Sequence, residues 1–256
     1  MSVSWTKSES KLAFHLYCQI PFGKVHRGNP DIIRLASLIG RSPSSVAMKM
    51  LNFASLDPAI TGTGRRGLSA ASKQDHEIWD EFHADWEGLA LECQALREEY
   101  GDIDTTDLTT DYDLPESFIG ESKPTVIQQR IKQSFFRRIV LSSYRGRCCM
   151  SGLSEPSLLI ASHIIPWSKD RKNRLNPSNG LCLSALHDKA FDQGFLSLSD
   201  DFRIIVSAAL YRRSDEFINR ALLPLDGKRI ELPERFIPDI RLITKHRNDV
   251  FIGSGS

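Results

Sequence analysis

Apolar residues recur at helical spacing along most of the first half of the chain. Thr6 and Glu9 have the spacing of a capping box, which predicts that a helix begins there. A second helix is expected over residues 31–39. A third is expected after Ser42 and Pro43, because serine is a favoured N-cap and proline fits the first helical position. The pattern therefore predicts a helical N-terminal part.

The chain after the third predicted helix contains both helical and β-type patterns. Helical spacing predicts long helices over residues 73–100 and 126–144. An apolar run rich in β-forming residues then ends at His163, and a hairpin is expected over residues 194–206. Residues 101–125 lack helical periodicity and are dense in Asp, Thr, Pro and Gly, which is typical of a linker.

These elements predict an α+β protein with two domains. A helical module is expected over residues 1–100, followed by an acidic linker over residues 101–125. The second domain is expected over residues 126–252, with a helical scaffold at its C-terminal end, and residues 253–256 as a flexible tail. At 256 residues the chain is long enough for each domain to bury its own core.

A short turn that contains Gly40 joins the predicted second and third helices. Two helices joined in this way resemble a DNA-binding helix-turn-helix, in which the second helix enters the major groove. The start of that helix would present Arg41, Ser44, Ser45 and Lys49 to DNA. An ordinary helical hairpin is the alternative interpretation.

Charge is distributed unevenly, although the formal net charge is only +1. Residues 1–74 carry a net charge of +7, residues 75–121 carry −15, residues 122–174 carry +9, and residues 175–256 are neutral. Two basic segments of this size suggest a nucleic-acid partner. The acidic segment is expected to be a solvated linker, and the alternative is an internal DNA mimic that lies against a basic groove.

Several protein classes are disfavoured by composition. No apolar run approaches the roughly 20 residues of a membrane helix, and the N-terminus lacks a signal-peptide core, so a cytoplasmic protein is expected. The five cysteines include no C-x-x-C pair, which favours reduced thiols over disulfides. Cys148 and Ser151 stand where such a pair would begin a zinc site, so no structural zinc is expected.

Three spaced motifs follow the second basic segment. They are His163-Ile-Ile-Pro-Trp, Asn179-Gly-Leu and His187-Asp-Lys-Ala-Phe-Asp-Gln-Gly. In this order they resemble the HNH endonuclease superfamily, and in particular its restriction-endonuclease-like branch. The resemblance covers about residues 135–207. It implies a ββα-metal nuclease fold for the C-terminal domain, with DNA as the substrate.

The resemblance also implies the roles of the site residues. His163 would be the general base that deprotonates water, since an imidazole titrates near neutral pH. Asn179 would orient the other nitrogen of that imidazole, and His187 would bind the divalent metal ion. Asp188 and Asp192 lie four residues apart on a predicted helix, so they share a face and could add oxygen ligands for Mg²⁺ or Mn²⁺.

One position departs from the family pattern. Many HNH nucleases place a metal-binding His or Asp directly before the base, and here that residue is Ser162, a poor ligand. A non-catalytic DNA-binding regulator with a degenerate HNH fold therefore stays as an alternative. A nuclease that a partner or small ligand activates is a third interpretation.

The segment between the base and the asparagine is basic. Its four cationic residues are expected to hold DNA phosphates beside the site: Lys169, Arg171, Lys172 and Arg174. The sequence thus predicts a metal-dependent DNA endonuclease, and the family resemblance implies restriction or another form of antiviral defence. Cutting both strands generally needs two active sites, which makes a homodimer plausible.

Overall fold

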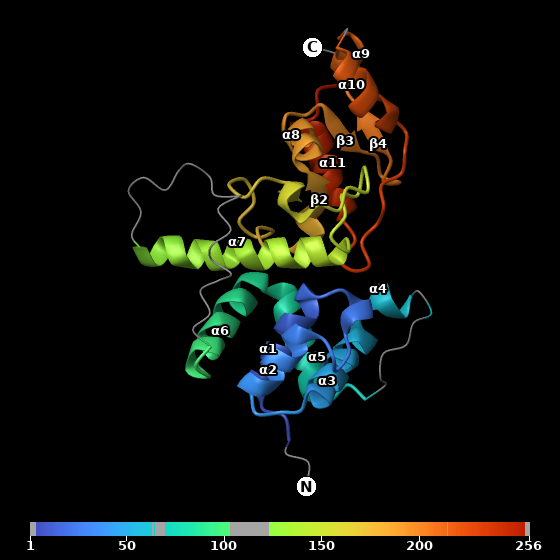
Figure 1. Ribbon diagram of the computed structural model, residues 1–256. Helices are drawn as coiled ribbons and strands as arrows, with labels where there is room; N and C mark the ends of the chain where they lie inside the picture. The colour runs from blue at the N-terminus through green and yellow to red at the C-terminus, as the bar shows by residue number, and fades with distance from the viewer. Residues whose placement is uncertain (1–3, 63, 65–69, 103–122, 214, 254–256) are drawn as a thin grey trace. The chain divides into compact units, whose positions relative to one another are not determined.

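The computed structural model describes residues 4–62, 64, 70–102, 123–213 and 215–253 (Figure 1). The chain divides into two compact units, Met1–Ser143 and Tyr144–Ser256, and we describe each by itself. Helices and small antiparallel sheets occur together, so the predicted α+β class is confirmed. No helix in the described ranges is long and apolar enough to cross a membrane.

The regular secondary structure in the described residues of the first unit is helical. Its α-helices are α1 (Lys7–Gln19), α2 (Pro30–Leu38), α3 (Pro43–Leu56), α4 (Pro58–Thr61), α5 (Lys73–Ala84), α6 (Trp86–Glu99) and α7 (Lys123–Ser143). Helix α1 is the centre of the unit, because it packs against α2, α3, α5, α6 and α7 (Figure 1). All its residues from Glu9 to Gln19 are buried.

The predicted starts of the first and third helices are confirmed. The Thr6 hydroxyl accepts a hydrogen bond from the Glu9 amide, and the Glu9 carboxylate accepts one from the Thr6 amide, which completes the capping box. The Ser42 hydroxyl caps α3 by accepting from the Ser45 amide at 3.2 Å. Gly40 has φ +67° in the turn between α2 and α3, a conformation that glycine adopts without a steric penalty.

Two expectations about the helices need correction. The predicted helix over residues 73–100 is two helices, because the backbone of Asp85 leaves the helical region and its carboxylate caps the amide of Gly88. Helix α7 falls in the first unit, where it packs on α1 and α6, although the sequence placed it in the second domain. The possible DNA mimic includes residues 103–122, which lie outside the described residues.

Oppositely charged segments of the first unit pair with each other in space. Lys11 binds Glu92 at 2.7 Å, and Lys49 binds Asp75 at 2.8 Å in the core. The cations come from the basic segment and the carboxylates from the acidic one. Much of the charge that the sequence assigned to a nucleic-acid partner is therefore neutralised within this unit.

The second unit contains two small sheets and four α-helices in its described part. Its elements are β1 (Leu159–His163), β2 (Gly180–Ser184), α8 (Ala185–Asp192), β3 (Leu196–Leu198), β4 (Ile204–Val206), α9 (Ala208–Tyr211), α10 (Glu216–Ala221) and α11 (Ile240–Asp249). Strands β1 and β2 are antiparallel, with His163 opposite Gly180, and α8 packs on both strands. This is the ββα order that the family resemblance implied.

The end of α8 requires a glycine. Gly194 has φ +74°, and a Cβ atom built there would lie 2.1 Å from the carbonyl oxygen of Val250. The Ile252 amide donates a hydrogen bond to the Gly194 carbonyl at 2.9 Å. The segment after α11 is thereby held against the end of α8, which anchors the C-terminal scaffold to the ββα element.

Candidate active site

The candidate site is built on β1, β2 and α8. His163 is the last residue of β1, Asn179 directly precedes β2, and His187 lies in the first turn of α8. The sheet register and the packing of α8 on both strands hold the three elements together. The long loop between the strands, residues 164–179, carries the basic residues.

The His163 ring is held in one tautomer by a backbone group. Its Nε2 atom lies 2.9 Å from the carbonyl oxygen of Arg174. A carbonyl oxygen only accepts, so Nε2 carries the proton and the lone pair of the neutral ring is on Nδ1. Burial lowers the pKa of His163 to about 4, against a smaller opposing effect of the Arg174 carbonyl. The imidazole is therefore neutral at neutral pH, with its lone pair on Nδ1. Its low pKa makes it a weaker base than the near-neutral imidazole that the sequence led us to expect.

Asn179 clamps the two ends of the loop and is fully buried. Its side-chain oxygen accepts from the Ile165 amide at 2.9 Å, and its side-chain nitrogen donates to the carbonyls of Ile165 and Asn173 at 3.1 Å each. The sequence led us to expect that Asn179 would orient His163 directly. In the structure, the acceptor for the imidazole is the Arg174 carbonyl, which the clamped loop brings there.

The loop exposes three of its four predicted phosphate-binding residues. Lys169, Arg171 and Lys172 are exposed. The half-buried Arg174 donates from Nε to the Trp167 carbonyl at 2.8 Å, and its guanidinium lies 5.4 Å from the centre of the Trp167 ring. Arg174 thus shapes the loop, while the other three residues face solvent on the same loop that supplies the contact to His163.

His187 is buried against a cysteine. The Ser184 hydroxyl caps α8 by accepting from the His187 amide, and Nδ1 of His187 lies 3.3 Å from Sγ of Cys148. Burial alone would raise the pKa of Cys148, but hydrogen bonds with His187 and with residues Met150 and Ser151 lower it to about 6. Because Nδ1 is engaged, metal binding by His187 would use Nε2.

Asp188 and Asp192 share a face of α8, as their spacing predicts. Burial and the nearby charge of Asp188 raise the pKa of Asp192 to about 6. The two carboxylates therefore repel each other, and a bound cation would relieve this repulsion. Among the described residues, however, no three His, Cys, Asp or Glu side chains are gathered as a metal site, so the expected three-residue set is not assembled.

Ser162 stands at the position where many HNH nucleases have a metal-binding residue. It is buried, and its hydroxyl oxygen has no hydrogen-bond partner within the part of the chain that the structure describes. A serine in this position supplies neither an imidazole nor a carboxylate.

The five cysteines of the chain are buried thiols.

Two of the four residues predicted to read DNA in the first unit are engaged inside that unit. Arg41 pairs with Glu9 at 2.7 Å, and Lys49 is buried beside Asp75. Both cations also lie over the ring of Trp5. The positive charge of Arg41 and Lys49 led us to predict DNA contact. In the structure both side chains form ion pairs and lie against Trp5 inside the first unit. Ser44 is exposed and Ser45 is half-buried at the start of α3.

Two contributors to the site were missed by sequence reasoning. The carbonyl of Arg174 orients His163, and the sequence holds no signal for a backbone acceptor. Cys148 contacts His187, although the sequence assigned it no role in the site. Its position at the start of the motif region was the available signal for that contact.

Comparison with known families finds a match that lies in the second unit. Residues 148–199 match the model of a family described as HNH endonuclease. This segment is therefore similar to HNH endonucleases, as the three motifs indicated. Among solved structures, the chain is similar to the modification-dependent TagI restriction endonuclease, with 21% sequence identity and a TM-score of 0.35. That similarity covers 45% of this chain and 37% of TagI, so it spans little more than a third of that protein. No curated protein matches the chain.

Proposed function

We propose that the chain is a divalent-metal-dependent DNA endonuclease in which His163 is the general base. The match to the HNH endonuclease family supports nuclease activity, and the tautomer of His163 supports the finer assignment. The observation that carries the proposal is the contact of Nε2 with the Arg174 carbonyl, because it leaves the lone pair on Nδ1. A neutral imidazole held in one tautomer can take a proton from the water that attacks the phosphodiester.

The remaining residues position the base and the substrate. Asn179 holds the loop closed, so that the Arg174 carbonyl stays against His163. Lys169, Arg171 and Lys172 bind phosphates of the DNA backbone next to the base and bring the scissile bond within its reach. Positive charge here also favours the approach of the polyanion.

A divalent cation fits the chemistry of the donors on α8. One imidazole and two carboxylates suit Mg²⁺ or Mn²⁺, and such ions often bind through one or two carboxylates together with substrate phosphate. The residues that would hold the ion together with substrate phosphate are Asp188 and Asp192. In the described residues His187 is not gathered with both of them as one metal-binding group. When bound, the ion supplies positive charge that stabilises the negative charge on the reacting phosphate.

The test is cleavage of supercoiled plasmid by the purified protein with Mg²⁺, with Mn²⁺ or with EDTA. We expect His163→Ala to lower the cleavage rate by about 10²-fold or more, the scale of general-base catalysis, while DNA binding stays nearly unchanged. His26→Ala, a change of an exposed histidine in the first unit, is the matched control. Full cleavage by His163→Ala would overturn the assignment of the base.

A non-catalytic DNA-binding regulator is the second candidate. It is favoured by the serine at position 162 and by the lack of an assembled metal-binding group in the described residues. This candidate predicts that the wild-type protein shifts DNA in a gel without nicking it in any metal. Cleavage that appears only after a cell extract is added would instead indicate activation by a partner or a ligand.

The biological setting follows from the family resemblance. We propose that the nuclease acts on DNA in the cytoplasm, in restriction or another antiviral defence, and that it cuts both strands as a homodimer. Light scattering of the protein with and without a short duplex tests the oligomeric state. A monomer on DNA that still makes double-strand breaks would contradict the dimer.

A further inference from the structure

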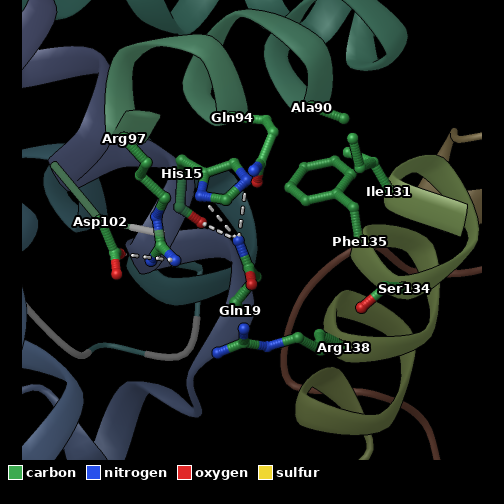
Figure 2. Close-up of a pocket in the computed structure, with 10 residues that line it drawn as sticks. All are labelled: His15, Gln19, Ala90, Gln94, Arg97, Asp102, Ile131, Ser134, Phe135 and Arg138. Carbon is green, nitrogen blue, oxygen red and sulfur yellow. Dashed lines mark hydrogen bonds and ion pairs between the residues drawn. The ribbon is translucent and has the colours of Figure 1, made fainter. Parts of the chain in front are cut away.

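Two buried histidines outside the candidate active site stack on phenylalanine rings. Figure 2 shows the first, His15 of α1, at a pocket of the first unit beside Phe135 and Gln19. The Gln19 side-chain nitrogen lies 2.8 Å from Nδ1 of His15 and 3.1 Å from the carbonyl oxygen of His15, so this hydrogen bonding stays within α1. The second, His246 of α11, instead binds groups of two other elements.

The ring of His246 connects three elements of the second unit. It is almost parallel to the ring of Phe191 on α8, at 11° and with ring centroids 3.8 Å apart. Its Nε2 atom lies 3.2 Å from the carbonyl oxygen of Phe191, and its Nδ1 atom lies 3.0 Å from the hydroxyl oxygen of Ser197 on β3. All three residues are buried, so solvent does not compete for these contacts.

The two hydrogen bonds fix the tautomer and the orientation of the ring. A carbonyl oxygen only accepts, so Nε2 of His246 carries the proton and donates to Phe191. The lone pair on Nδ1 then accepts from the Ser197 hydroxyl. Burial lowers the pKa of His246 to about 4, against a smaller opposing effect of the Phe191 carbonyl, so the ring is neutral near neutral pH. One orientation of the ring therefore satisfies both nitrogens.

The backbone of His246 holds the C-terminal segment at the same place. Its carbonyl oxygen accepts from the amides of Val250 and Phe251 at 2.9 and 3.2 Å. The amide of the next residue, Ile252, donates to the carbonyl of Gly194 just after α8. The end of α8 is thus held by the side chain of His246 and by the segment that the backbone of His246 organises.

Asp192 directly follows Phe191, at the end of α8. A shift of the Phe191 backbone would therefore move the Asp192 carboxylate, which a divalent ion needs at a fixed place. Residues that orient metal ligands through hydrogen bonds typically change metal affinity by about 10–100-fold when they are replaced. His246 lies outside the segment 148–199 that matches the HNH family, so the motifs of the sequence do not include it.

We propose that His246 is a positioning residue for the metal-binding carboxylate of Asp192. It acts through the Phe191 carbonyl that it binds, and the Ser197 hydroxyl holds its ring in the orientation that this bond requires. The inference rests on the proposed function, because it takes Asp192 as a ligand of the divalent ion.

The test measures Mn²⁺ binding by the full-length protein without DNA, by titration calorimetry after removal of metal with EDTA and dialysis. His246→Phe keeps a ring that can stack on Phe191 but removes both hydrogen bonds, and we expect it to weaken Mn²⁺ binding at least about tenfold. His246→Gln restores a side-chain N–H that can donate to the Phe191 carbonyl, and it should bind Mn²⁺ nearly as the wild type does.

A control separates positioning from a general loss of stability. Leu210→Ala leaves a cavity under α9 and lowers stability without removing either hydrogen bond of His246, so the folded protein should keep the wild-type affinity for Mn²⁺. Wild-type affinity in His246→Phe would overturn the inference. So would an equal loss of affinity in Leu210→Ala, or a His246→Gln protein that binds as weakly as His246→Phe.

Asp192→Asn separates this inference from the proposed function. Weak Mn²⁺ binding by Asp192→Asn, together with wild-type affinity in His246→Phe, would overturn the inference and leave the proposed function intact. Equal binding by the wild type and Asp192→Asn would overturn both proposals, because Asp192 would then not be a ligand.

Hydrogen exchange of the wild-type protein, located by mass spectrometry, requires no variant to fold. The Val250 amide bonds to the His246 carbonyl, so Mg²⁺ bound at Asp192 should slow exchange at the end of α11 as well as in α8. Helix α10 of the same unit, whose residues are all at least partly exposed, is the reference and should exchange equally with and without Mg²⁺. Slower exchange that is confined to α8 would overturn the inference.

Discussion

Asn179 has its largest structural effect through the backbone groups that it binds. Its buried side chain joins Ile165 to Asn173 and so closes the loop that brings the Arg174 carbonyl to His163. The family motif predicts the identity of Asn179, but not these partners. A motif records side chains at fixed spacings, whereas the partners are backbone atoms that reach Asn179 only when the loop has folded.

We predict that Asn179→Asp lowers both stability and activity. The carboxylate could still accept from the Ile165 amide, but it cannot donate to the carbonyls of Ile165 and Asn173. Each buried group left without a partner costs about 1–3 kcal/mol. Urea unfolding should show this loss, and the cleavage rate should fall because His163 is no longer held.

Asn219→Ala is the control for this change, because Asn219 is exposed on α10. A surface substitution of this kind should alter the free energy of unfolding by no more than about 0.5 kcal/mol. If Asn179→Asp were as stable and as active as this control, the loop clamp would not be what holds the base.

Periodicity predicted the helices of the first unit but missed the break between α5 and α6. Phe82, Trp86 and Leu89 continue the helical spacing across the junction of α5 and α6, so the pattern could not reveal a break. The break occurs because Asp85 is extended and caps the next helix through its side chain. Periodicity also predicted α7 as a helix but could not show which unit it packs on, since that depends on the matching surfaces of α1 and α6.

The loop over residues 164–179 should set the salt dependence of DNA binding. Each Lys or Arg that binds a DNA phosphate contributes about −0.9 to the slope of log affinity against log salt concentration. Replacing Lys169, Arg171 and Lys172 together by glutamine should therefore make the slope shallower by about 2.7. Arg241→Gln, a change of an exposed residue on α11, should leave the slope unchanged. An unchanged slope in the triple variant would show that DNA does not contact this loop.

On α8, the raised pKa of Asp192 makes its charge unfavourable near neutral pH. The stabilisation from its protonated form is present below the unfolded pKa of about 4 and is lost as the pH rises through about 6. We therefore expect Asp192→Asn to raise the melting temperature at about pH 7.5 in EDTA. Mg²⁺ should raise the melting temperature of the wild type and have less effect on the variant.

The control is Asp249→Asn, because Asp249 is an exposed carboxylate on α11. This change should alter neither the melting temperature in EDTA nor the increase caused by Mg²⁺. A lower melting temperature for Asp192→Asn in EDTA would contradict the proposed repulsion with Asp188. An equal Mg²⁺ effect in the wild type and Asp192→Asn would remove Asp192 from the set of metal ligands.

At the scale of the whole molecule, the charge pattern is visible in the sequence, but the partners of the charged residues are not. The basic and acidic segments at the N-terminal end pair with each other, as Lys11 with Glu92 and Lys49 with Asp75 show. Segment charges add up residues without regard to distance, so they cannot distinguish internal ion pairs from a surface for DNA. The basic loop of the second unit is different, because three of its cations are exposed.

Buried histidines in both units should make the stability of the whole chain depend on pH. Burial lowers the pKa of His163 and His246 to about 4 and that of His15 well below its usual range. Each is neutral in the folded state, whereas the unfolded chain binds a proton below about pH 6.5. The unfolded state thus gains protons first, and the free energy of unfolding should fall as the pH drops from about 6.5 toward 4.

Asp192 opposes this trend, because its raised pKa makes the folded state take up a proton in the same range. The Asp192→Asn protein removes that opposing effect and should lose stability more steeply than the wild type between about pH 6.5 and 5. Urea unfolding at closely spaced pH values measures both slopes. Carboxylates with lowered pKa values, such as Glu9 and Asp170, contribute mainly below about pH 4.5, so they do not account for a change in this window. A flat profile in Asp192→Asn would mean that the three histidines are protonated as readily in the folded chain as in the unfolded one.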